Sequence, residues 1–133
     1  MGNPAANKNS IVQAIDTHIV MVPSPGGPVP TPLPHPFVGP FQSALSTTVK
    51  IAGQPAATVD SVANNRPAHI PTPPGVSFQK PPANQGTVML GSMTVKIDGK
   101  MAARLTDTVK TCNDPADAPV GQIITGVPNV MIG

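Results

Sequence analysis

The chain has almost no large aromatic side chains, because its 133 residues include three Phe and no Trp or Tyr. Charged residues are also scarce, at 11% against about 25% in an average globular protein. The few Lys and Arg residues are scattered, which excludes the clustered basic face typical of nucleic-acid-binding proteins. No apolar run approaches the ~18–20 residues that span a membrane as a helix. The first ten residues lack the apolar segment of a secretory signal, so we expect the chain to be made and assembled in the cytoplasm.

A single cysteine, Cys112, excludes an internal disulfide framework. The 19 Pro and 12 Gly residues come close to the content of about 25–30% at which disorder is the usual interpretation. A proline-rich adaptor that is disordered alone is therefore one alternative. Disordered chains, however, are usually strongly charged and poor in β-branched residues, whereas this chain is weakly charged and rich in Val, Ile and Thr. We therefore predict a compact all-β domain with many turns.

The chain nearly repeats itself, since residues 48–57 (TVKIAGQPAA) return 46 residues later as residues 94–103 (TVKIDGKMAA). Each copy leads to a corner of the type Asp-Ser/Thr-Val, at Asp60 and at Asp107, and we assign a third corner to Asp16. Repetition at this period is typical of stacked or symmetric units, and each unit is too small to bury its own apolar face. The repeat predicts a small pseudo-threefold, conical domain of the β-prism or β-helix-like type.

The expected organisation is a flexible N-terminal tail over residues 1–10 and a single domain over residues 11–133. Residues 23–40 are dense in proline and are expected to form an extended surface loop, because proline cannot donate to a sheet ladder. Residues 62–85 and 111–122 form two further loops. If the three units surround an axis, these loops converge at one end of the cone, the apex. At the opposite end, the base, our candidate residues are Val88, Leu90, Val130 and Ile132.

All three histidines and the cysteine lie in or beside these loops, at His18, His35, His69 and Cys112. Three imidazoles and a thiolate form a complete tetrahedral set for a structural zinc ion, and imidazole also suits iron. A lone loop histidine is more often a solvated side chain, and a lone cysteine is more often a small buried hydrophobe. The convergence of the loops nevertheless favours a metal site. A structural zinc contributes about 10–16 kcal/mol of apparent binding free energy in small peptides, which would supplement a core with few aromatic residues.

Catalytic interpretations have little support in the sequence. There is no G-x-S-x-G nucleophile elbow, and four protein ligands would fill the position that a catalytic zinc keeps open for water. We therefore expect no enzyme activity. The alternative is a small zinc-dependent hydrolase whose Cys/His site is open to solvent.

Residues 99–109 (GKMAARLTDTV) resemble the Pro-Ala-Ala-Arg repeat that names the PAAR family, with Met101 in place of the proline. Residues 54–60 resemble a second copy, in which Thr58 replaces the arginine. The ending, residues 126–133, resembles the closing strand of the family, and residues 30–37 resemble its PAAR-like members.

The resemblance implies a sharp cone that caps the trimeric spike of a contractile injection system, either a type VI secretion machine or an extracellular phage-tail-like particle. It implies one tip per VgrG-like trimer, with any effector cargo as a separate chain, and transient contact with the target membrane that the tip punctures. The scattered basic residues predict no nucleic-acid partner. Delivery is then outward, at the tip of the particle. Family members bind a metal near the apex through histidines and a cysteine, which by position are His18, His35, His69 and Cys112.

Overall fold

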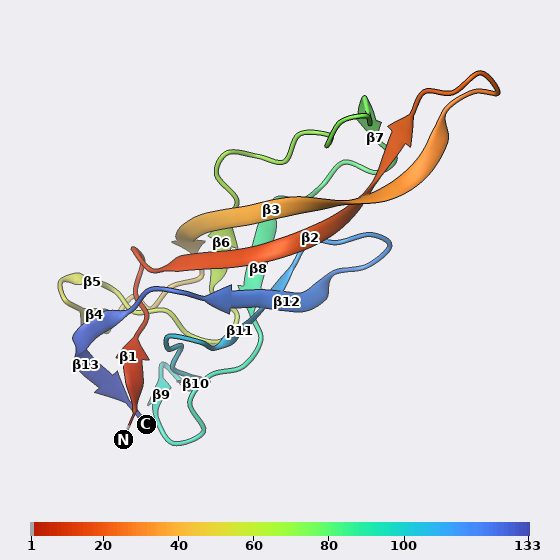
Figure 1. The fold of residues 1–133 in the computed structure, drawn as a ribbon. Coiled ribbons are helices and arrows are strands. Elements are labelled where there is room, and N and C mark those ends of the chain that lie inside the picture. The colour runs from red at the N-terminus through yellow and green to blue at the C-terminus, as the bar shows by residue number, and fades with distance from the viewer. Residues whose placement is uncertain (1) are drawn as a thin grey trace.

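The computed structural model describes residues 2–133, so Met1, the first residue of the expected tail, lies outside the described part. Figure 1 shows an elongated molecule, with short hairpins and both chain ends at its wide end and a long ribbon at its narrow end. The described residues form strands and no helix, which confirms the prediction of an all-β domain. Nothing in residues 2–133 is a long, apolar helix of the kind that crosses a membrane.

The strands are β1 (Asn3–Ala5), β2 (Ile11–Val22), β3 (Val29–Ser43), β4 (Lys50–Ile51), β5 (Gln54–Pro55), β6 (Val62–Asn64), β7 (Ser77–Phe78), β8 (Gln85–Val88), β9 (Lys96–Ile97), β10 (Lys100–Met101), β11 (Thr108–Thr111), β12 (Ala118–Ile123) and β13 (Val127–Ile132). Seven of them form one sheet in the order β12-β11-β8-β6-β3-β2-β7, and β12 also pairs with β2. The other six form three two-stranded hairpins, β4–β5, β9–β10 and β1–β13.

The narrow end is the antiparallel ribbon of β2 and β3, which pair without a break from Ile11↔Pro40 to Val22↔Val29. This corrects the expected surface loop over residues 23–40, of which only the turn at its start lies outside the strands. The physical reason is the spacing of the prolines. In an antiparallel pair, alternate residues direct their N–H groups to opposite edges, so a proline at every second position leaves the ladder with β2 intact. The prolines that alternate in this way are Pro30, Pro32, Pro34 and Pro36.

The inward face of the ribbon contains both core residues and buried polar side chains. Every second residue of β2 from Val12 to Val20 is buried, as a strand with one face on the core requires. Val12 and Ala14 of this row pack with Phe37, Phe41 and residues of β11 and β12 in the larger core cluster. Asp16 and His18 continue the same row and are buried with it.

The wide end is built around a closed ring of backbone hydrogen bonds. Ala6 N–H donates to the Ala103 carbonyl at 3.0 Å, Ala103 N–H to that of Ala57 at 3.0 Å, and Ala57 N–H to that of Ala6 at 3.1 Å. All three alanines are fully buried. The ring therefore marks a pseudo-threefold axis, and the third copy of the repeat is Pro4-Ala5-Ala6-Asn7. The assignment of the third corner to Asp16 was wrong.

The three hairpins surround this ring in the same register. Ile51 pairs with Gln54, Ile97 with Lys100 and Ile132 with Asn3. The first two hairpins turn at Ala52-Gly53 and Asp98-Gly99, where both residues of each pair have positive φ, as a tight two-residue hairpin requires. The third hairpin has no turn, because β13 supplies one strand from the end of the chain and β1 supplies the other from its start.

A flexible tail over residues 1–10 is therefore not what the structure shows for residues 2–10. Ala5 and Ala6 are fully buried, because they occupy the positions that alanines fill in the other two repeats. Ala5 and Ile132 belong to a second core cluster under the hairpins. Of our base candidates, Val88 and Ile132 have buried side chains, whereas Leu90 is exposed.

Candidate metal centre

Four buried side chains converge where the ribbon leaves the sheet. Asp16 and His18 come from β2, His69 from the segment between β6 and β7, and Cys112 from the residue after β11. One ligand atom from each lies within 4.8 Å of all the others. Three of these residues, His18, His69 and Cys112, were predicted from the sequence as metal ligands, and the structure brings them together.

The contacts within this cluster define a small polar centre. The Sγ atom of Cys112 lies 3.5 Å from Asp16 Oδ2 and 3.6 Å from His18 Nε2. His69 Nε2 lies 3.0 Å from the same Asp16 oxygen, and the His18 and His69 rings are 4.9 Å apart between centroids. The four donors thus face one point.

Asp16 was not predicted as a ligand, since its carboxylate had been interpreted as a corner residue. Its two oxygens have separate roles. Oδ1 accepts hydrogen bonds from the Thr111 hydroxyl and the Asn113 side chain, whereas Oδ2 faces His69 and Cys112. A signal was present in the sequence, because Asp16 and His18 are two residues apart and thus share one face of a strand.

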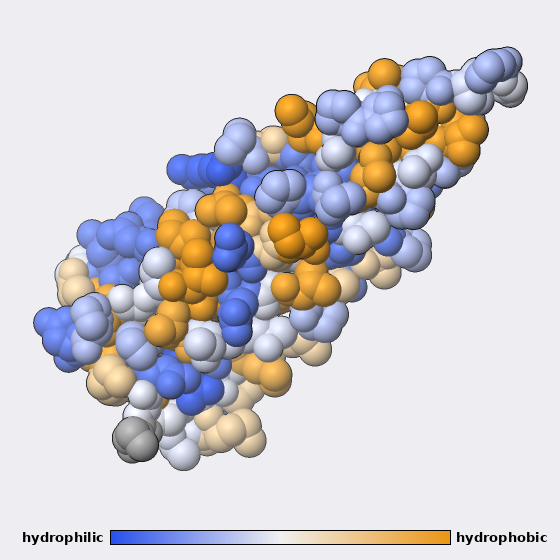
Figure 2. Space-filling model, viewed as in Figure 1, coloured by the Kyte–Doolittle hydropathy of each residue, from blue (hydrophilic) through white to orange (hydrophobic). Residues whose placement is uncertain are grey.

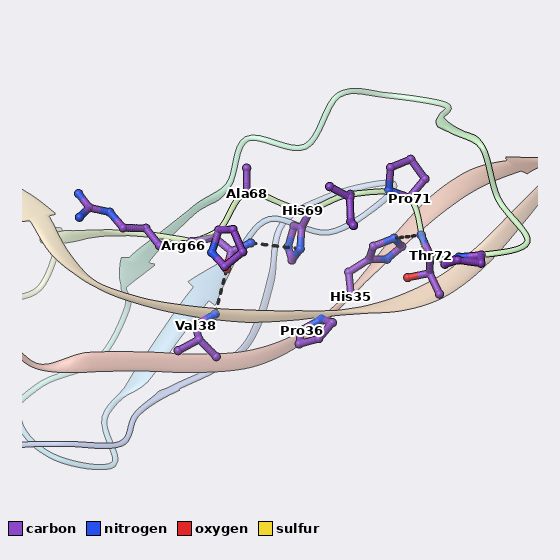
Figure 3. A pocket seen from close by; sticks show the side chains of 12 residues that line it. His35, Pro36, Val38, Arg66, Ala68, His69, Pro71 and Thr72 are labelled. Carbon is purple, nitrogen blue, oxygen red and sulfur yellow. Dashed lines mark hydrogen bonds between the residues drawn. The ribbon is translucent and has the colours of Figure 1, made fainter.

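His35 lies beside the cluster but uses its nitrogens elsewhere. It is paired with Asp16 across the ribbon, and its ring centroid is 5.4 Å from that of His18 and 5.6 Å from that of His69. Its Nδ1 lies 2.8 Å from the Leu33 carbonyl oxygen, and its Nε2 accepts the Thr72 N–H at 3.1 Å. Figure 3 shows this second bond, which ties the segment after β6 to β3.

The two histidines of the cluster are oriented by different partners. The side-chain oxygen of Asn65 accepts the Val38 N–H, which leaves its NH₂ group to donate to His69 Nδ1 at 3.1 Å. The proton of His69 is therefore on Nε2 and is donated to Asp16. A metal bound through this nitrogen would replace that hydrogen bond.

Burial sets the protonation of the cluster. Burial is the largest influence on the pKa of His18 and lowers it, and the nearby His69 ring lowers it further. Burial likewise lowers the pKa of His35. For Cys112, burial and the neighbouring Asp16 carboxylate raise the pKa of the thiol to about 11. Without a metal, His18 and His35 are therefore neutral at pH 7, and the Cys112 thiol keeps its proton, which metal binding must displace.

The donor set fits a metal ion of the zinc type. Two imidazole nitrogens, a sulfur and a carboxylate oxygen are all zinc ligands, and four protein ligands are typical of a closed structural site. His18 supports this fit, because it directs its Nε2 atom to the centre, 3.6 Å from the Cys112 sulfur. A surface hollow of about 400 Å³ between β3 and residues 65–73 adjoins the cluster, with His35 and His69 at its inner wall (Figure 3). The cluster itself is buried, unlike a hydrolytic site that is open to solvent.

The cluster does not lie at the tip of the narrow end, where a metal-bound apex was predicted from the sequence. The ribbon continues for four residue pairs past His18↔Leu33 before it turns, so the turn after β2 forms the narrow tip and the cluster lies behind it. Fold and cluster together define a small pseudo-threefold all-β domain with a buried group of potential metal ligands.

Residues 79–133 match the family model of the PAAR motif. This confirms the resemblance for that part of the chain, which contains the β9–β10 hairpin, the closing strand β13 and Cys112. The other three predicted ligands, His18, His35 and His69, lie outside the matched residues. Comparisons with curated proteins and with solved structures give no match.

Proposed function

We propose that this protein is the tip of a contractile injection system, where it caps a trimeric spike and carries no catalytic activity. The observation that carries the proposal is the closed ring of Ala6, Ala57 and Ala103. It gives a single chain three near-equivalent hairpins in one register, which is the symmetry that a threefold spike presents. The PAAR motif over residues 79–133 supports the same role.

The wide end is the face proposed to meet the spike. The blunt end of a trimeric β spike exposes three equivalent strand edges, and such edges promote aggregation unless they are covered. A monomer with three similar hairpins can cover all three at once, at one tip per trimer. The equivalent outward positions of the hairpins are Lys50, Lys96 and Met131, which pair with Pro55, Met101 and Pro4.

The narrow end is proposed to meet the target membrane first. Its β3 edge lacks donors at alternate residues, so it cannot recruit a further strand over that stretch. A narrow ribbon concentrates the contraction force on a small area of membrane. Puncture in this proposal is mechanical, after assembly in the cytoplasm and outward delivery with the particle, and separate effector chains would travel with it.

Zinc is the metal we propose for the cluster, held by His18, His69 and Cys112 with Asp16 as the fourth ligand. His35, the fourth ligand expected from the sequence, then has a structural role, because its hydrogen bond with Thr72 joins β3 to the segment after β6. A bound ion would add a further link between β2, that segment and the segment after β11, which are already joined by hydrogen bonds such as Asp114 N–H to the Thr17 carbonyl. It would thereby stiffen the ribbon at its root.

Elemental analysis of the purified protein tests the metal site. We expect about one zinc per chain in the wild type and its loss in His69→Ala and Cys112→Ser. Asp16→Ala and His35→Ala separate the two candidates for the fourth ligand, since the first should lose the metal and the second should retain it. Asp117→Ala, at an exposed carboxylate of the same region, is the matched control. A wild type free of metal would contradict the site.

Native mass spectrometry with the trimeric spike protein of the same particle tests the docking. One chain per trimer is expected, with weaker binding in the double variant Lys50→Glu/Lys96→Glu. Lys110→Glu, an exposed lysine on β11, provides the charge-matched control. Three chains per trimer, or no complex, would contradict a pseudo-threefold cap.

A further inference from the structure

His18 presents one nitrogen to the cluster and the other to a carboxylate that the cluster does not include. Its Nδ1 lies 3.5 Å from Oδ2 of Asp114, and the two side chains are 1% and 3% exposed. Neither His18 Nδ1 nor Asp114 Oδ1 has a hydrogen-bond partner. An unpartnered polar atom in a buried contact is costly, and Nδ1 of His18 is such an atom, with Asp114 Oδ2 facing it at 3.5 Å.

Asp114 is held against β2 on both sides of His18. Its backbone N–H donates to the Thr17 carbonyl at 2.8 Å, and its Oδ2 accepts the Ile19 N–H at 2.9 Å. The Lys80 ammonium lies 3.5 Å from the other oxygen, Oδ1. The carboxylate is thus fixed in place by the backbone around His18 and does not depend on the histidine for its position.

We propose that Asp114 is the positioning residue of the metal centre: it selects the tautomer of His18 that carries its proton on Nδ1. The Nε2 lone pair then faces Cys112 and the centre of the cluster, ready for a metal. The inference rests on the proposed metal site. Carboxylates that orient a ligating histidine in this way commonly contribute tenfold to hundredfold in metal affinity.

His69 supplies the contrast within the same cluster. Its Nδ1 faces a donor, the NH₂ group of Asn65, so its proton is on Nε2 in the metal-free protein. The two histidines are therefore predicted to be opposite tautomers. His18 is preset for coordination, whereas His69 is held by Asp16 until a metal arrives.

The tautomers can be read without any metal, by long-range ¹H–¹⁵N correlation NMR of the metal-free wild type at pH 7.5. We expect His18 to show a protonated Nδ1 and an unprotonated Nε2, and His69 to show the reverse. In Asp114→Ala, His18 should lose this preference, whereas Asp114→Asn, which keeps an oxygen for His18 and Ile19, should retain it. His18 protonated on Nε2 in the wild type would overturn the proposal, and this measurement needs no variant to fold.

Metal affinity gives the second measurement, by competition with a chromogenic zinc chelator and from the visible spectrum of the Co²⁺-substituted protein. Asp114→Ala should bind zinc tenfold to hundredfold more weakly than wild type, with altered Co²⁺ bands, and Asp114→Asn should fall between the two. Lys80→Ala, which touches the same carboxylate but not His18, and Asp117→Asn should match the wild type. Circular dichroism of each metal-free variant checks the fold.

The two proposals fail in different ways. If Asp114→Ala folds and binds zinc as tightly as wild type with an unchanged spectrum, the positioning role is overturned and the metal site stands. If the wild type binds no zinc, the metal site of the proposed function fails, and the affinity contribution of Asp114 fails with it. The NMR result then still decides whether Asp114 sets the His18 tautomer.

Discussion

Alkaline pH should destabilise the metal-free protein through a single buried thiol. The pKa of Cys112 is raised from 9.0 to about 11 in the folded protein. Below pH 9 the thiol is protonated in both the folded and the unfolded state, so the full contribution is present. Between pH 9 and pH 11 the unfolded chain loses this proton while the folded protein retains it, so the free energy of unfolding falls as the pH rises. The expected loss is roughly 1 kcal/mol at pH 10 and roughly 2 kcal/mol at pH 11.

Urea unfolding at pH 8, 9, 10 and 11 measures this loss, with Cys112→Ala as the reference. The variant has its own stability offset from the small cavity it leaves, but that offset does not change with pH. Other groups titrate equally in both proteins, so the difference between the two curves isolates the thiol.

Bound zinc should abolish the alkaline loss of stability in the wild type. A metal-bound sulfur is already a thiolate, so the zinc-loaded protein should not show the loss between pH 9 and pH 11. Parallel curves for metal-free wild type and Cys112→Ala across this range would refute the reasoning, because they would mean that the thiol is not held neutral in the folded state.

Three further outcomes follow from burial and packing. The lowered pKa values of His18 and His35 mean that the unfolded chain binds more protons below pH 6.5, so metal-free stability should fall as the pH drops through that region; thermal melts from pH 7.5 to 5 measure it, and a flat profile would contradict it. Ala57→Val inserts two methyl groups beside the alanine ring and should lower the free energy of unfolding by about 1–3 kcal/mol, whereas Ala83→Val at an exposed site should change it little, as urea titration would show. Gly39→Ala should prevent folding to the native sheet, because its Cβ would lie 1.6 Å from a backbone carbonyl oxygen; a native-like circular dichroism spectrum would refute this.

The repeated segments were predictable because they are complete in the sequence. Residues 48–57 and 94–103 contain both strands and the turn of a hairpin, so the similarity of the two copies led directly to β4–β5 and β9–β10. The third copy was missed for a physical reason. Its strands lie at opposite ends of the chain and are paired only by folding, so no local window contains the hairpin, although Pro4-Ala5-Ala6-Asn7 was present as a signal.

The β3 strand was missed because proline density was weighed without proline spacing. A count of prolines indicates a loop, but prolines at every second residue remove donors from one edge only. The partner of that strand, β2, was indicated by its alternation. The spacing of the prolines in β3, together with the alternating pattern of β2, would have predicted the strand, whereas the number of prolines alone did not.

The candidate site was predictable by residue type more than by geometry. The scarcity of His and Cys pointed to His18, His69 and Cys112, which do meet in space. Whether Asp16 or His35 completes the set depends on where each side chain finds its hydrogen bonds. That is decided by Thr72, 37 residues from His35, and by Asn113, 97 residues from Asp16, and neither pairing is visible in a local sequence pattern.

The hairpin of β1 and β13 also constrains how the molecule comes into being. Its two strands pair residues as far apart in the sequence as Asn3 and Ile132, so this hairpin is the least local of the three. Contacts of such separation form slowly, and during synthesis β1 has no hairpin partner until residues 127–132 have been made. The proposed spike-binding face therefore gains its third hairpin later than the two local ones, and its pseudo-threefold symmetry is complete only when β13 pairs with β1.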